Sequence, residues 1–267
     1  MICVSFSKPT VEQFLSQHPE VKMIELRLDL MDVNEAQLRR FLSLPVDVIV
    51  TCRPNGRMTE EQRLQLLQRC LLFGSRGDIK SPCLRHCERS EAIQKNNVLI
   101  PAKAGIPQNK DVSKGIAGQA RNDGIIDVSH VGARYVDVEI ESGMEFISTI
   151  REFATKHNCK LIASYHNFEK TPALSELKEI AERCHVAQAD IVKIACMVND
   201  EQDVLNIKSL YSADYPLIAL GMGEKGVITR IKACEWGAPF TFAAASSDAV
   251  TAPGMVGYEI VKRLINR

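Results

Sequence analysis

Hydrophobic and polar positions follow two alternating patterns along most of the chain. Short apolar runs typical of buried strands are each followed by a stretch whose apolar residues recur every three or four positions, as on one face of a helix. Leu64, Leu67 and Leu71 have this helical spacing. The expected strands are 2–6, 22–28, 46–52, 134–140, 159–165, 189–195, 215–220 and 239–244. The expected helices are 10–17, 34–43, 59–73, 143–156, 173–187, 200–212, 224–236 and 254–265.

The order of these elements predicts an α/β fold with a parallel sheet, because each strand is followed by a helix. Eight such units are the number that closes a (β/α)8 barrel of the TIM type, which is our prediction. A doubly wound open sheet is the alternative. Pro172 and Pro253 suit the starts of the helices that follow them.

One segment, residues 75–132, does not fit this pattern. Charges, prolines and glycines are mixed there without a sustained apolar face. A stretch of this length without periodicity is unusual inside a compact domain and indicates an insertion or an irregular segment. We therefore predict one barrel domain over residues 1–267, with the insertion between its third helix and fourth strand. We assign the insertion no chemistry.

Composition and charge exclude several classes of protein. The 33 Lys and Arg residues balance the 33 Asp and Glu residues, so no global field favours nucleic acid or an acidic membrane surface. No apolar run reaches the roughly 18 residues of a membrane span. The nine cysteines are typical of reduced, buried thiols in a cytoplasmic protein. Cys83, His86 and Cys87 lack a second ligand pair at zinc spacing, so we expect no metal site.

Lys193 is the most informative residue because it lies in the apolar run from Asp190 to Met197, within the expected strand 189–195. Strand alternation places Ile191, Lys193 and Ala195 on one face. A buried ammonium is costly unless it is paired or loses its proton. Desolvation lowers the pKa of a lysine, and a neutral amine attacks carbonyls to form imines. The alternative is a lysine at a strand end whose ammonium reaches water.

Charged residues on two further strands point to a ligand site. Glu25 and Arg27 are two positions apart and share a face, where charges of both signs are costly unless a polar ligand or an internal ion pair uses them. Arg53 follows a strand end, where barrel side chains point into the substrate cleft. Its guanidinium suits a carboxylate or hydroxyls. A surface position for Arg53 is the alternative.

The next two strands offer candidates for proton transfer. Asp137 and Glu139 share one strand face and could pair with a lysine, orient a histidine or form a purely structural network. His166 shares a face with Ser164 at the end of strand 159–165. Histidine is the side chain best suited to exchange protons near neutral pH. A lone histidine at a strand end is more often incidental, which is the alternative here. A histidine that faces a buried lysine on the adjacent strand is less often so, which favours a chemical role for His166.

The C-terminal part carries a glycine motif and a loop of small residues. The run from Gly221 to Gly226 matches a dinucleotide fingerprint, but it lies in the seventh unit and lacks the acidic residue that binds ribose. We interpret it as a tight turn that places Arg230 over the cleft. The loop from Ser246 to Met255 is typical of a mobile lid.

These segments together resemble the type I 3-dehydroquinate dehydratases, the Schiff-base enzymes of the shikimate pathway of aromatic amino acid biosynthesis. The resemblance covers nearly the whole chain outside 75–132. The matching segments are IELRLD (24–29), TCR (51–53), YVDVEIE (135–141), ASYHNFEKTP (163–172), ADIVKIA (189–195), MGEKGVITR (222–230) and TAPG (251–254).

The resemblance implies a cytoplasmic lyase that dehydrates 3-dehydroquinate to 3-dehydroshikimate without a metal or cofactor, in a family whose members are often homodimers. Lys193 would form the imine and His166 would be the general acid and base. The implied substrate-binding residues are Glu25, Arg27, Arg53, Arg230 and Thr251.

Three features depart from the family pattern. Arg57 occupies a position that is usually acidic, Met255 replaces a glutamine, and the N terminus is shorter than in many members, without the hairpin that plugs the base of the barrel. Thr251 stands where the lid usually offers a serine. Loss of one substrate hydrogen bond costs about 1–3 kcal/mol, or about 10- to 100-fold in catalytic efficiency. Two alternatives stay open: another Schiff-base barrel enzyme, such as a class I aldolase, and a homologue that binds ligand without turnover.

Overall fold

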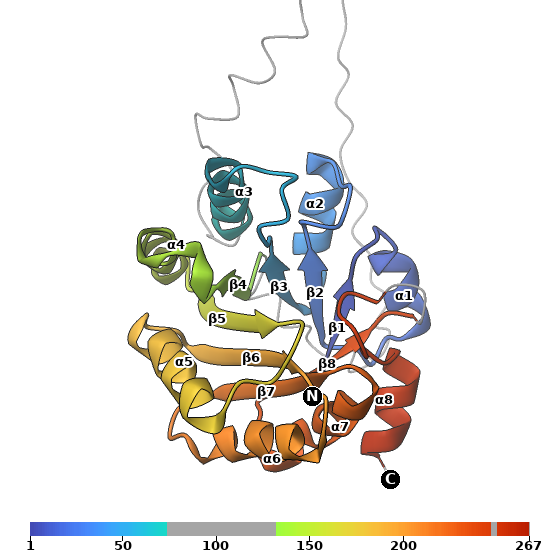
Figure 1. The fold of residues 1–267 in the computed structure, drawn as a ribbon. Coiled ribbons are helices and arrows are strands. Elements are labelled where there is room, and N and C mark those ends of the chain that lie inside the picture. The colour runs from blue at the N-terminus through green and yellow to red at the C-terminus, as the bar shows by residue number, and fades with distance from the viewer. Residues whose placement is uncertain (74–131, 247–249, 267) are drawn as a thin grey trace, which may run out of the picture. The chain divides into compact units, whose positions relative to one another are not determined.

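The computed structural model describes residues 1–73, 132–246 and 250–266, in which eight parallel strands form a nearly closed barrel surrounded by helices (Figure 1). The strand order is β7-β6-β5-β4-β3-β2-β1-β8. Each strand from β1 to β7 thus lies beside the next one in sequence, and β8 returns to pair with β1. In a doubly wound sheet the order of the strands would instead reverse at the first strand, so that later strands lie on its other side. The predicted (β/α)8 fold is confirmed.

The strands of the barrel are β1 (Ile2–Phe6), β2 (Met23–Arg27), β3 (Asp47–Thr51), β4 (Tyr135–Glu139), β5 (Lys160–Asn167), β6 (Ile191–Met197), β7 (Leu217–Met222) and β8 (Thr241–Ala244). The α-helices are α1 (Val11–Gln17), α2 (Glu35–Leu42), α3 (Glu60–Leu72), α4 (Met144–Lys156), α5 (Leu174–Val186), α6 (Glu201–Ser209), α7 (Val227–Trp236) and α8 (Tyr258–Ile265). Short 3₁₀ turns are η2 (Ile140–Ser142), η3 (Leu210–Ser212) and η4 (Glu224–Gly226).

Local sequence explains where several helices begin. Asn34, Thr59 and Asp200 cap α2, α3 and α6. Each side chain accepts a hydrogen bond from the backbone of the third helical residue, and that residue's side chain accepts one from the cap backbone. These reciprocal bonds satisfy backbone donors that a helix terminus leaves free.

The predicted start of the last helix is wrong. Pro253 does not begin a helix, and α8 starts four residues later than predicted, at Tyr258. Gly254 has φ +67°, a left-handed conformation that a right-handed helix does not contain. The Pro253 carbonyl accepts a hydrogen bond from Gly223 N at 3.1 Å. Residues 250–257, here called the lid loop, therefore pack against the turn after β7.

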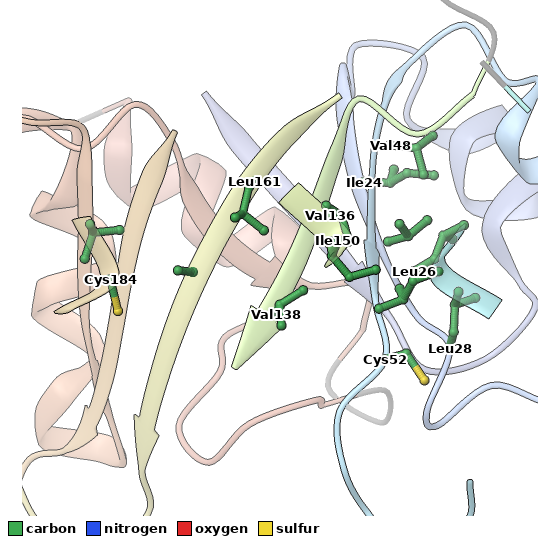
Figure 2. Packing of buried hydrophobic residues seen from close by; sticks show 14 of the residues in the cluster. Ile24, Leu26, Leu28, Val48, Cys52, Val136, Val138, Ile150, Leu161 and Cys184 are labelled. Atoms are coloured by element: carbon green, nitrogen blue, oxygen red, sulfur yellow. The ribbon is translucent and has the colours of Figure 1, made fainter. Parts of the chain in front are cut away.

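Apolar side chains fill two separate regions of the barrel. Outward-facing residues of the strands pack against buried residues of the helices. Figure 2 shows Ile24, Leu26, Val136 and Val138 of the strands in this cluster together with Ile150 of α4. A second cluster occupies the barrel interior. The interior cluster includes Cys3, Met23, Ile49, Tyr135, Ile162, Ile191, Ile218 and Phe240. The interior is therefore a packed core with an apolar floor.

The predicted insertion lies outside the described residues except for Gly132, so the prediction of one domain with an inserted segment stays a prediction. Gly132 itself is buried, and its N–H donates to Leu42 O at 2.8 Å. Among the helices in the described ranges, none has both the length and the apolar character needed to span a bilayer.

We predict that buried leucines of the helices stabilise the folded protein and that exposed ones do not. Leu177 on α5 is 0% exposed, whereas Leu205 on α6 is 53% exposed. Leu177→Ala should lower the free energy of unfolding by about 2–5 kcal/mol, because it removes buried methyl groups and leaves a cavity. Leu205→Ala, the matched control, should change it by less than about 0.5 kcal/mol. Urea unfolding measures both, and equal losses would contradict the packing described.

Candidate active site

The inward-facing residues change from apolar to charged along the barrel. Strand alternation places the next inward residue two positions after each residue of the apolar floor, toward the carboxyl ends of the strands. Parallel register then brings these polar residues together across neighbouring strands. This polar layer consists of Ser5, Glu25, Thr51, Asp137, Ser164 and Lys193, all buried.

Lys193 projects into the polar layer and is only 4% exposed. Its Nζ lies 2.7 Å from Asp137 Oδ2 and 3.8 Å from Glu25 Oε1. The face of Phe242 covers it, with 4.1 Å between Nζ and the ring centroid. The alternative of an ammonium that reaches water is therefore wrong. A buried lysine needs either an anionic partner or the loss of its proton, and here Asp137 is the anionic partner.

Asp137 is held as a carboxylate by its neighbours. Ser164 Oγ donates to Asp137 Oδ1 at 2.5 Å, and Lys193 donates to the other oxygen. Burial by itself raises the pKa of this carboxyl, but the charges of Lys193 and Arg53 outweigh it and hold the pKa well below its usual range. Asp137 is therefore a fixed negative charge beside the amine at neutral pH.

Glu25 is bound on both carboxylate oxygens by hydroxyl groups from adjacent strands. Ser5 Oγ donates to Oε2 at 2.5 Å, and Thr51 Oγ1 donates to Oε1 at 2.9 Å. Burial opposes the charge of Glu25, but Lys193 and Arg27 outweigh burial and lower its pKa. Glu25 thus presents a second oriented acceptor to the cavity.

His166 and Arg53 meet at one oxygen of Glu139. Arg53 Nη1 lies 2.8 Å from Glu139 Oε1, and His166 Nδ1 lies 2.9 Å from the same atom without the alignment of a hydrogen bond. Burial raises the pKa of Glu139 to about 7, although Arg53 opposes the shift. Burial, together with Arg53 and Lys193, lowers the pKa of His166 well below its usual value. His166 is therefore neutral at physiological pH.

Arg27 ties the lid loop to the barrel. Its Nε and Nη2 donate to the two carboxylate oxygens of Asp29 at 3.0 and 2.7 Å, and its Nη1 donates to Thr251 O at 3.1 Å. The Thr251 hydroxyl lies 2.9 Å from Ser5 Oγ and 3.1 Å from Met255 Sδ. The lid loop is thus bonded to both β1 and β2.

Arg230 is a buried cation without an anionic partner in the described part of the chain. It lies on α7, is 2% exposed, and its Nε has no hydrogen-bond acceptor. Burial lowers its pKa to about 10, with a small opposing effect of Glu25. A buried unpaired guanidinium is costly, so this geometry favours binding of an anionic group.

All seven predicted site residues line one cavity of about 30 Å³: Glu25, Arg27, Arg53, His166, Lys193, Arg230 and Thr251. The other lining residues are mostly apolar and include Phe168, Leu220, Phe242 and Met255. This volume holds about one water molecule. A six-membered ring is larger than this cavity, so binding of such a ligand requires some of the lining residues to move.

Arg57, which departs from the family pattern, does not line this cavity. Its side chain is exposed, and Nη1 lies 3.4 Å from Asp29 O. Met255, the second departure, lies directly at the cavity. Only the change at Met255, of these two, therefore alters the wall of the site.

The glycine motif after β7 forms the predicted tight turn. A Cβ on Gly221 would lie 2.8 Å from Gly226 Cα, so the two backbones are in direct contact. A Cβ on Gly254 would lie 2.2 Å from Gly223 O. The lid loop therefore rests on this turn at a point where no side chain fits.

Sequence reasoning missed three residues of the site: Ser5, Thr51 and Asp29. Ser5 and Thr51 are small polar residues on inward faces of apolar strands, which is the one signal that could have found them. Asp29 lies two positions after Arg27, in the turn that follows β2. The partners of Ser5 and Thr51 come from other strands or from the lid loop, so spacing along the chain does not reveal them. Asp29 is instead bound by Arg27, two positions earlier in the chain.

Comparison with known proteins identifies the family of this chain. The sequence model of the family described as type I 3-dehydroquinase matches residues 119–266. A 3-dehydroquinate dehydratase of Desulfotalea psychrophila is 30% identical over 268 residues, covering 96% of this chain and 92% of that protein. The chain belongs to the type I 3-dehydroquinase family.

Other 3-dehydroquinate dehydratases match part or all of the chain. A 3-dehydroquinate dehydratase of Methanocaldococcus jannaschii is 40% identical over 136 residues, which is 49% of this chain and 60% of that protein. A crystal structure of the type I enzyme from Clostridium difficile, with covalently modified comenic acid, superposes with a TM-score of 0.69. It is 21% identical and covers 99% of this chain and 90% of that chain, which supports the shared fold.

We predict that Gly254 holds the lid loop on the turn after β7. Gly254→Ala should break the hydrogen bond from Gly223 N to Pro253 O, because the new Cβ overlaps the Gly223 backbone. Hydrogen exchange at the Gly223 amide should become faster, with a loss of stability of about 1–2 kcal/mol from the left-handed backbone.

The matched control is Gly143→Ala. Gly143 also has a positive φ of +86°, but a Cβ there would meet nothing within 4 Å. This variant should lose similar stability while exchange at Gly223 stays unchanged. Equal exchange rates at Gly223 in both variants would contradict the contact.

Proposed function

We propose that this chain dehydrates 3-dehydroquinate to 3-dehydroshikimate through a covalent imine on Lys193, with His166 as the general acid and base. The observation that carries the proposal is the arrangement of one cavity. A buried amine and a neutral imidazole from adjacent strands line it together with a buried arginine that has no anionic partner among the described residues.

In the first step the Lys193 ammonium passes a proton to the neutral His166, and the resulting neutral amine attacks the ring ketone. The register between β5 and β6 pairs Ser164 with Lys193 and His166 with Ala195, so His166 lies one inward position closer to the cavity mouth. His166 transfers the protons that convert the carbinolamine to an imine and release water. Asp137 accepts a hydrogen bond from the amine and keeps it oriented.

The second step is elimination. The protonated imine withdraws electrons and acidifies the neighbouring C–H bond, and His166 removes that proton. The electron pair forms the new carbon–carbon double bond, and the β-hydroxyl leaves as water with a proton from His166. Water then hydrolyses the imine and frees the product and Lys193. One histidine on one side of the ring serves both proton transfers, which implies a syn elimination.

Substrate recognition rests on the charged wall of the cavity. Arg230 can bind the substrate carboxylate in a bidentate manner, because no carboxylate of the described residues forms an ion pair with it. Arg27, Arg53, Glu25 and Thr251 lie around the same space and are the proposed partners of the ring hydroxyls. Met255 replaces the glutamine that is usual at this position, and its thioether forms a weaker hydrogen bond to substrate than an amide would. We therefore expect a weakened but active enzyme.

Two expectations of the sequence belong to this proposal: a cytoplasmic location and a homodimer. The described cysteines are free and, apart from Cys234, buried, as suits a reducing compartment. Sedimentation equilibrium of the full chain measures the oligomeric state directly.

The central prediction concerns covalent capture. Borohydride added during turnover of 3-dehydroquinate should reduce the imine and leave a substrate adduct on Lys193, located by peptide mass spectrometry. Lys193→Ala should lose both adduct and turnover, whereas the exposed Lys178→Ala should keep both. An adduct on another lysine would end the proposal. A product of carbon–carbon cleavage would instead indicate an aldolase, and ligand binding without turnover an inactive homologue.

A second prediction separates activity from stability at Arg230. Arg230→Met should lower kcat/KM by about 10- to 100-fold, because a charged hydrogen bond to the carboxylate is lost. The same change should raise the melting temperature, because a buried unpaired cation is removed. The exposed Arg183→Met should change neither. Full activity of Arg230→Met would assign the carboxylate to another residue.

A further inference from the structure

Arg63 is a buried arginine that lies outside the cavity of the proposed active site. It is 3% exposed and belongs to α3, which packs beside α4 in the helix layer (Figure 1). Within the described residues its guanidinium contacts a carbonyl, a hydroxyl and an aromatic ring but no carboxylate. A buried cation without an anion is costly, so these contacts indicate what Arg63 does for the fold.

The guanidinium of Arg63 links the chain that follows β3 to the chain that follows β4. Its Nε donates to Cys52 O at 3.0 Å, and its Nη2 donates to Ser142 Oγ at 3.3 Å. Cys52 is the first residue after β3, and Ser142 ends the short turn η2 after β4. The ring of Phe146 on α4 supports the guanidinium, with 4.9 Å between its central carbon and the ring centroid.

This link lies where β3 and β4 are no longer paired. The last register pair between the two strands is Thr51 with Asp137. Two residues further along, Glu139 pairs in register with β5, whereas β3 has ended at Thr51. Arg63 therefore connects the two chain segments at the level at which the Arg53 side chain reaches the cavity.

We propose that Arg63 is a positioning residue that holds Arg53 in place at the cavity. This inference rests on the proposed function and deepens it, because Arg53 is one of the proposed partners of the ring hydroxyls. The Cys52 carbonyl belongs to the planar peptide unit that ends at the Arg53 nitrogen. A bond to this carbonyl therefore fixes the direction in which the Arg53 side chain leaves the backbone. Arg63 does not line the cavity, so it acts on substrate through Arg53.

Arg53 depends on such an anchor because the chain around it has little other support. Residues 52–58 form neither helix nor strand. At the far end of the side chain, Nη1 lies 2.8 Å from Glu139 Oε1 and Nη2 lies 3.8 Å from Asp137 Oδ2. The buried Nε has no hydrogen-bond partner within the described residues. A ligand that takes up these donors competes with the two carboxylates, so the backbone position then decides where the guanidinium lies.

The start of α3 holds Arg63 itself in a fixed position. Thr59 caps the helix and exchanges reciprocal hydrogen bonds with Gln62, the residue that precedes Arg63. The Arg63 amide donates to Thr59 O at 3.0 Å, which closes the first turn. A side chain on a capped helix turn is a firmer anchor for a loop than another loop residue would be.

The contacts of Arg63 require an arginine. Nε and Nη2 lie on the same edge of a planar guanidinium and can donate to two acceptors at once. The ammonium of a lysine can replace only one of these two donors, and it lacks the flat face that packs on Phe146. Lysine at this position should therefore keep part of the anchoring, whereas methionine, which has no donor, should lose it.

The first test compares Arg63→Met, Arg63→Lys and the control Leu177→Ala in turnover of 3-dehydroquinate by the full chain. Arg63→Met should raise KM and lower kcat/KM by about 10-fold, because a displaced Arg53 loses hydrogen bonds to substrate. Arg63→Lys should recover part of this loss. Leu177→Ala removes core packing away from the cavity and should keep the KM of wild type at a temperature where all variants are folded. Equal KM values in wild type and Arg63→Met would overturn the proposal.

A double-mutant cycle tests whether Arg63 acts through Arg53. Arg53→Met alone should lower kcat/KM by about 10- to 100-fold. Addition of Arg63→Met to this variant should then change kcat/KM by less than about twofold, because no guanidinium is left to position. A loss as large as the one that Arg63→Met causes in wild type would contradict the role assigned to Arg63.

A spectroscopic measurement separates this inference from the function on which it rests, because it needs no turnover. The ¹⁵N NMR signal of Arg53 Nε–H, assigned by its absence in Arg53→Met, should shift in Arg63→Met and stay unchanged in Leu177→Ala. An unchanged Arg53 signal in Arg63→Met would overturn the positioning role alone. Absence of both turnover and borohydride trapping in wild type would overturn the proposed function alone. If Arg63→Met does not fold, Arg63→Lys provides the same comparisons with smaller changes of the same sign.

Discussion

The buried ion pair between Lys193 and Asp137 is the interaction on which the rest of the barrel interior depends. Neither charge is tolerable alone at this depth, because removal of one partner leaves the other without compensation. The apolar floor beneath the pair excludes water, and Ser164 binds the remaining carboxylate oxygen. These constraints confine the amine to one orientation, toward the cavity that His166 also enters.

The remaining charges of the site are arranged so that one positive charge lacks a partner. Arg27 is paired with Asp29 and Arg53 with Glu139, whereas Arg230 has no carboxylate within the described residues. An anionic ligand would complete the set. Arg27 also binds the lid loop, so the residues that bind a ligand and those that close the cavity form one hydrogen-bonded group. Ligand binding and closure are therefore expected to be linked.

Several predictions succeeded because the barrel imposes simple geometric rules on the chain. Alternation along each strand placed Glu25 with Arg27 and Asp137 with Glu139 on inward faces, and the carboxyl-end rule placed Arg53 at the cavity. The last helix was placed too early, because Pro253 looks like a helix start while Gly254 takes a left-handed backbone. That conformation is imposed by contact with a distant turn, which local sequence does not contain.

Hydrophobic periodicity by itself determined the eight strands, the order of strands and helices and the inward faces, since these depend on residues close in sequence. Only the tertiary structure decided which charges pair. The choice between Asp137 and Glu139 as partner of Lys193, the missing anion at Arg230 and the hydroxyl contacts of Ser5 all depend on register between strands far apart in the chain. Distances of a few ångströms determine such electrostatic contacts, and only the closed barrel establishes those distances.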